Sequence, residues 1–233
     1  MRFFRSSLLA ALLASAPAAA LLVPSDAQAS VSIAVGFDAL VKDADSVGVV
    51  VPQEAKSLWE DGRIYTYTRV KIDQGIAGEL GTGAEGWVRT MGGVIGKIGQ
   101  MVDGEPVLNT NKPALLFLRK LKAGNGWEVS ARAQGQYPIL TDDTTKARKV
   151  IRAASVGVLF PPRVNAEAAA VVDPKTQSLT APAAGAAAGT ASGQVKAIRL
   201  AGDVIHDRPL DEAAREIAAT WKKLHPAPAS DKK

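Results

Sequence analysis

The sequence predicts a mainly β protein built around a small antiparallel barrel or sandwich. One reason is that residues 64–72 alternate strictly with a period of two, beside a turn that contains Asp61 and Gly62, which indicates a β-hairpin. Another is that short apolar runs follow one another closely, separated by turn residues and with little helix between them. Together these patterns favour several short strands that share one core.

The first predicted elements precede the hairpin. A short amphipathic helix is indicated by apolar residues at helical spacing, namely Phe37, Leu40, Val41 and Ala44. The β-branched run at 47–51 is too short for a helix and predicts a buried strand, which Pro52 is expected to end.

More strands are expected after the hairpin. Glycines punctuate the connection to a strand at 87–89, and the compact apolar run PALLFL at 113–118 predicts a central, buried strand. Segments 127–131, 137–140 and 149–154 are expected to supply the last pairings.

The first residues indicate export. Arg2 and Arg5 precede an apolar run, and Ala27 and Ala29 flank Gln28 as a signal peptidase requires. We therefore expect a signal peptide at 1–29, a periplasmic or secreted product, and no transmembrane span after cleavage. The chain contains no cysteine, so its core is expected to hold without disulfides.

Composition divides the rest of the chain. We expect an OB-like β domain at 30–160, an Ala/Pro/Gly-rich disordered linker at 161–193, a strand and a helix within 194–225, and a disordered tail at 226–233. The strand is placed at 195–204. The helix is expected to begin at Pro209 and to dock through one face: Ile217, Trp221 and Leu224.

The segment VIGKIGQMV at 94–102 has two interpretations. Gly96 and Gly99 could form the GxxG clasp of a KH module on RNA, or the glycines could serve a β-hairpin. A KH clasp needs a helix directly after its second glycine. Here Gly104 and Pro106 follow too soon, so the hairpin is favoured.

No catalytic residue, metal site or cofactor is indicated. The two histidines, His206 and His225, both lie near the C-terminus without a ligand spacing, and no serine sits in a GxSxG elbow. The formal net charge of +5 comes from interspersed charges of both signs, which does not favour a dedicated polyanion site.

One surface remains as a candidate ligand-binding site. Tyr65, Tyr67, Arg69 and Lys71 are expected on one face of one strand, where aromatic and basic side chains can stack on bases or sugars and pair with phosphates. Lys97 would join them in a basic groove. The competing interpretation, which we favour, is an ordinary solvated sheet face.

The ordered motifs resemble a known family. FDALVKDADSVGVVV, WEDGRIYTYTRVKI, WVRTMGGVIGKIGQMVDGEP, PALLFL and WEVSARAQGQY together resemble a family of uncharacterised bacterial secreted proteins. Such domains are similar to the OB-type barrels of netrin-like modules and tissue inhibitors of metalloproteinases. The resemblance implies an OB-like barrel. The inhibitors' mechanism needs an N-terminal cysteine, which this chain lacks.

The resulting hypothesis is an exported, non-enzymatic binding or envelope-associated module, with an envelope or extracellular protein as a candidate partner. Two alternatives stay open. One is an envelope hydrolase with an unrecognised site, and the other is nucleic-acid binding through the GxxG loop or the tyrosine-bearing strand, which export disfavours.

Overall fold

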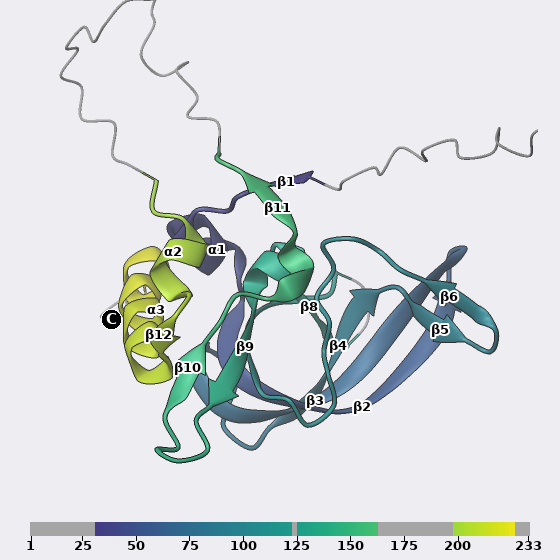
Figure 1. The fold of residues 1–233 in the computed structure, drawn as a ribbon, viewed down its shortest axis with the longest axis horizontal. Coiled ribbons are helices and arrows are strands. Elements are labelled where there is room, and N and C mark those ends of the chain that lie inside the picture. The colour runs from purple at the N-terminus through teal and green to yellow at the C-terminus, as the bar shows by residue number, and fades with distance from the viewer. Residues whose placement is uncertain (1–30, 123–124, 163–197, 227–233) are drawn as a thin grey trace, which may run out of the picture.

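The computed structural model describes residues 31–122, 125–162 and 198–226, and these are mainly β, as the sequence predicts. The predicted signal peptide at 1–29 lies outside the described residues. So do nearly all of the predicted linker at 161–193 and tail at 226–233. In Figure 1 a barrel carries the helices α1 (Phe37–Asp43), α2 (Ala201–Ile205) and α3 (Leu210–Leu224) on one side. The hairpin of β5 (Gly93–Ile95) and β6 (Ile98–Gln100) lies on the opposite side.

Five strands close into the barrel. They are β2 (Ser46–Glu60), β3 (Arg63–Gly78), β4 (Glu85–Met91), β7 (Ala114–Lys120) and β8 (Trp127–Val129). The ring runs β7-β2-β3-β4-β8 and returns from β8 to β7. Every pair is antiparallel except β4–β8, which is parallel. This closed five-stranded ring confirms the OB-like barrel.

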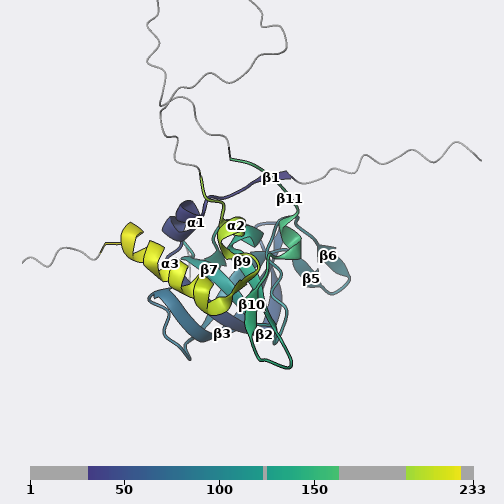
Figure 2. The same cartoon turned by 60° about the vertical axis from the view of Figure 1, so that its left-hand side comes forward.

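The remaining strands extend one edge of β7 or lie apart. The C-terminal half of that edge pairs with β8, whereas its N-terminal half pairs with β9 (Gln136–Thr141). From β9 the sheet continues to β10 (Arg148–Val150) and β12 (Arg208–Pro209). A separate parallel ribbon joins β1 (Val31–Ile33) to β11 (Val158–Phe160), and Figure 2 shows it rising from the barrel.

The strand β7 is buried on both faces and separates two hydrophobic cores. Leu116 and Leu118 point into the barrel, where they meet Val50, Val70 and Val88 among others. The alternate residues of β7 face a second core beneath the helices. Its members include Phe37, Leu40, Val47, Val49, Leu115, Phe117, Tyr137, Ile205, Leu210 and Ile217. Two-sided burial is the reason that PALLFL reads as one continuous apolar run.

The predicted hairpin is confirmed, but its first strand is longer than expected. Asp61 and Gly62 form the two-residue turn, and both have positive φ, which suits the right-handed twist of a hairpin. The prediction that Pro52 ends the strand is wrong. β2 continues to Glu60, and the register shift between Pro52 and Ala55 is a bulge that accommodates the proline.

The VIGKIGQMV segment is a β-hairpin, as predicted. β5 (Gly93–Ile95) pairs with β6 (Ile98–Gln100) around the turn at Gly96, whose φ is +60°. No helix follows in residues 101–113, so the helix that a KH clasp requires is missing there. The side-chain oxygen of Gln100 accepts the Ile64 N–H at 2.7 Å and ties the hairpin to the barrel.

The C-terminal segment differs in part from the prediction. A strand was expected at 195–204, but 201–205 forms the helix α2 (Ala201–Ile205). Ala201, Val204 and Ile205 recur at helical spacing and are buried, so the docked face of a short helix prevails over β propensity. In the described part of the expected strand, Leu200 forms an isolated β-bridge with Gly36.

The predicted terminal helix is confirmed as α3 (Leu210–Leu224), with Pro209 at its N-cap rather than at its first residue. Ile217 is buried, and Trp221 and Leu224 pack against the same core as α1 (Phe37–Asp43). The helix is therefore part of the core under β7 and not an appendage.

The glycines of the β5–β6 hairpin differ in their expected tolerance. Gly93 has φ +137°, and a Cβ there would collide with the hydroxyls of Ser57 and Thr66, which lie 2.9 Å apart in a hydrogen bond. Gly93→Ala should lower the free energy of unfolding by about 1–3 kcal/mol in urea titrations. Gly96→Asn is the control, because Asn tolerates the left-handed region and nothing lies within 4 Å. An equal decrease in the free energy of unfolding in both variants would contradict the expected difference.

Candidate functional site

The structure places four of the five predicted site residues together. Tyr65, Tyr67, Arg69 and Lys71 lie on the outer face of β3, because the alternate residues of that strand point into the barrel. Lys97 is exposed in the turn of the β5–β6 hairpin, on a different element. The first four form one surface, and Lys97 belongs to another.

Acidic side chains are paired with Arg69 and Tyr67 on the predicted strand face. Arg69 pairs with Glu54 at 3.4 Å and with Glu85 at 3.9 Å, through Nε and Nη1 respectively. Tyr67 donates a hydrogen bond of 2.7 Å to Glu60. Burial, together with that hydrogen bond, raises the pKa of Tyr67. This face therefore carries mixed charge rather than a positive field for phosphates.

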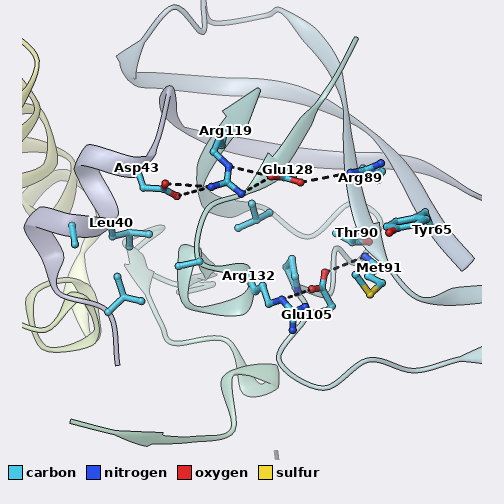
Figure 3. Close-up of a pocket in the computed structure, with 15 residues that line it drawn as sticks. Leu40, Asp43, Tyr65, Arg89, Thr90, Met91, Glu105, Arg119, Glu128 and Arg132 are labelled. Atoms are coloured by element: carbon cyan, nitrogen blue, oxygen red, sulfur yellow. Dashed lines mark hydrogen bonds and ion pairs between the residues drawn. The ribbon is translucent and has the colours of Figure 1, made fainter. Parts of the chain in front are cut away.

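A cavity of about 550 Å³ lies beside that face, where α1 meets one end of the barrel. It is bounded by α1, by β3, β4, β7 and β8, by the β6–β7 loop and by the start of η1 (Arg132–Gly135). Its charged lining consists of Asp43, Arg89, Glu105, Arg119, Glu128 and Arg132. Figure 3 shows these groups around the hollow, with apolar side chains between them.

Four charges of alternating sign form one wall. Arg119 donates from Nε to Glu128 at 3.1 Å and from Nη1 to Asp43 at 3.3 Å. Glu128 reaches Arg89 at 3.8 Å on its other side, and Arg89 also lies 3.5 Å from Glu60. The sheet register produces this row, because Glu128 is opposite Arg119 on β7 and opposite Arg89 on β4. Dashed lines in Figure 3 trace the row.

The opposite wall is built by the β6–β7 loop and by the start of η1. Glu105 accepts the Met91 N–H at 3.0 Å through Oε2 and pairs through Oε1 with Arg132 Nε at 3.0 Å. The Glu105 side chain is 13% exposed, so this carboxylate is held firmly. Ala131 and Arg132 have φ of +53° and +54°, a left-handed conformation that non-glycine residues rarely adopt. The backbone therefore turns sharply where Arg132 lines the cavity.

Two arginines of the cavity, Arg89 and Arg119, have raised pKa values and stay protonated. The hydrogen bond to Glu128 raises the pKa of Arg119, with a further contribution from the charge of Asp43. Burial lowers the pKa of Arg89, but its hydrogen bond to Tyr67 and nearby charges outweigh burial, and the net shift is upward. Arg89 also lies over the ring of Tyr65, 4.7 Å from its centroid.

The two histidines have structural partners outside the cavity. His206 Nδ1 accepts the Arg152 N–H at 3.0 Å, and the ring of His225 stacks on Trp221 at 3.9 Å between centroids. Within the described ranges, no group of three or more His, Cys, Asp or Glu could hold a metal ion. No helix in the described part of the chain is long and apolar enough to cross a bilayer.

Sequence reasoning missed most of the cavity. None of its charged residues is among the predicted site residues; Arg89 lies in the strand predicted at 87–89, and Arg119 directly follows the strand predicted at 113–118. A usable signal existed in Glu128, a charged residue between the apolar Trp127 and Val129 in a segment that is predicted to pair in the sheet. What the sequence could not supply is the parallel β4–β8 pairing that puts Glu128 beside Arg89.

Comparisons with known proteins do not assign the chain to a family. No protein-family model, no curated protein and no solved structure matches the chain. The resemblance to a family of bacterial secreted proteins therefore stays a prediction.

The Arg119–Glu128 pair offers a direct test of the charged wall. A double-mutant cycle with Arg119→Ala and Glu128→Ala should give a coupling energy of about 0.5–1 kcal/mol that falls in high salt, because the Arg119 side chain is 42% exposed. The control cycle, Lys120 with Glu79, joins side chains that are 56% and 79% exposed and should couple more weakly, because solvent screens both charges. Coupling of the same size in both pairs would refute the expected difference.

Proposed function

We propose that this chain is a non-enzymatic binding module that acts outside the bacterial cytoplasm, and that the cavity beside α1 holds its ligand. The observation that carries the proposal is the cavity itself. Its volume of about 550 Å³ suits a small organic molecule, since ligand pockets usually measure about 300–1,000 Å³. It combines an apolar lining with a few charged groups that converge from separate elements, as ligand sites do.

The rigidity of the wall supports binding. The row from Asp43 to Arg89 is cross-linked by ion pairs, and β strands supply Arg89, Arg119 and Glu128. A ligand would therefore meet groups that are already oriented, which reduces the entropy lost on binding. The raised pKa values of Arg89 and Arg119 favour the role of fixed cations over that of proton donors and acceptors near neutral pH.

The alternatives have weaker support. Nucleic-acid binding through the β3 face would need a positive surface, and there Arg69 and Tyr67 are engaged by acidic partners. A hydrolase would need a nucleophile or a base poised in the cavity, and the lining residues offer paired carboxylates and arginines. Both alternatives remain distinguishable outcomes of the experiments below.

A fragment screen tests the proposed cavity. Some compounds at about 1 mM should raise the melting temperature of the purified protein, because a ligand that binds only the folded state stabilises it. Ala39→Trp, on the α1 wall, should abolish the increase by filling the cavity. Ala219→Trp, at another exposed helical alanine, serves as the control.

The outcomes of the screen separate the functions. Stabilisation that persists in Ala39→Trp would show that the compound binds outside the cavity. If no compound stabilises the protein, the cavity proposal is overturned. Mass spectrometry of each stabilising compound after incubation should recover it unchanged. Hydrolysed products would instead favour the enzyme.

Fractionation of cells tests the predicted location. The native protein should be found in the periplasm or medium, with a mature chain that begins at Ser30, because residues 1–29 carry the pattern of a signal peptide. N-terminal sequencing and intact mass measure this directly. An intact chain beginning at Met1 in the cytoplasm would contradict export and reopen nucleic-acid binding.

A further inference from the structure

We infer that the cavity ligand is a small carboxylic acid with an apolar body, held as its anion between Arg89 and Arg132. This inference rests on the proposed function, since it names the class of molecule that the same cavity would bind. Its basis is an excess of hydrogen-bond donors over free acceptors in the cavity wall.

The carboxylates of the cavity already have partners at both oxygens. Asp43 receives Arg119 Nη1 at 3.3 and 3.4 Å, one distance to each oxygen. Glu128 binds Arg119 through Oε1 and faces Arg89 through Oε2. Glu105 uses Oε1 for Arg132 and Oε2 for the Met91 N–H. A ligand that offers only donors would have to compete with these interactions.

Two of the arginines keep donors in reserve. Arg89 uses one donor for Tyr67, but its nearest carboxylates are 3.5 and 3.8 Å away, longer than the roughly 2.7–2.9 Å of a charge-assisted hydrogen bond. Arg132 approaches Glu105 through Nε, and among the described residues no second carboxylate lies within 4.0 Å of it. A guanidinium has five N–H donors, so both side chains can still donate to an oxyanion.

The backbone supports a role for Arg132 beyond surface solubility. Two consecutive non-glycine residues, Ala131 and Arg132, adopt the left-handed conformation, which is strained for residues other than glycine. Arg132 lines the cavity at this sharp turn, while its side chain remains 56% exposed. A strained residue that presents a partly free cation to a cavity is typical of a ligand contact.

The charge balance of the lining favours a ligand with one negative charge over a dianion. Three arginines and three carboxylates line the cavity, so the lining is formally neutral. A phosphate dianion would be repelled by Glu105 and Glu128 close to the arginines that attract it, whereas a carboxylate matches the planar guanidinium with one charge. Apolar side chains such as Leu40, Met91 and Val129 would contact the ligand body.

The test compares an acid with its neutral isostere. Titration of the isotopically labelled full chain with 4-phenylbutyrate, followed by NMR, should shift amide signals of residues 89–91 and 128–132. 4-Phenylbutanamide has nearly the same shape without the charge, and should bind about tenfold more weakly, the ratio that a lost charged hydrogen bond gives. Phenyl phosphate should also bind more weakly than the carboxylate.

Variants then test which arginines bind the carboxylate of the ligand. Arg89→Gln and Arg132→Gln should each weaken the binding of 4-phenylbutyrate by about tenfold. The charge-conserving variant Arg132→Lys should retain part of the affinity. Arg148→Gln is the matched control. Arg148 is an ion-paired arginine on β10 outside the cavity, 2.9 Å from Asp73, and its loss should leave binding unchanged.

Each result has a defined meaning. Equal affinity for the acid and the amide, or wild-type binding by Arg132→Gln, would overturn the carboxylate inference and leave the proposed binding function standing. If none of the three compounds shifts the cavity signals, the carboxylate inference fails, whereas the proposed function fails only if the fragment screen also finds no ligand for the cavity. Tighter binding of phenyl phosphate than of 4-phenylbutyrate would show that the cavity prefers a phosphorylated ligand to a carboxylic acid.

Discussion

The two-sided burial of β7 is the constraint on which the rest of the structure depends. Leu116 and Leu118 fill the barrel, while Leu115 and Phe117 fill the core below the helices. Buried apolar area on both faces means that neither layer can be removed without exposing the strand. The barrel and the helical layer are therefore parts of one folding unit, and the C-terminal helix α3 contributes to it from the far end of the sequence.

The position of the cavity follows from this arrangement. β7 leaves the buried region at Arg119, in the half of its edge that pairs with β8, and there it meets Asp43 at the end of α1. Charged side chains can be tolerated there because each finds a partner on a neighbouring strand or helix. The same geometry that ends the apolar run thus concentrates paired charges around a hollow.

The pairing of these charges also explains their chemical character. Arginines held by carboxylates remain cationic and fixed, and an arrangement of this kind recognises a charged group better than it transfers a proton. The aromatic strand face noted from the sequence belongs to the same region, since Tyr65 reaches the cavity beside Arg89. Its neighbours Tyr67 and Arg69 are engaged with acidic residues instead.

The sequence by itself determined the elements whose patterns are local. Period-two alternation with Asp61 and Gly62 fixed the long hairpin, the run PALLFL fixed the central strand, and Gly104 and Pro106 excluded a helix after VIGKIGQMV. Only the tertiary structure decided the closure of the ring, the helix at 201–205 and the meeting of Glu128 with Arg89. The reason is that turns and periodicity depend on neighbouring residues, whereas strand pairing and charge partners depend on which distant segments share a core.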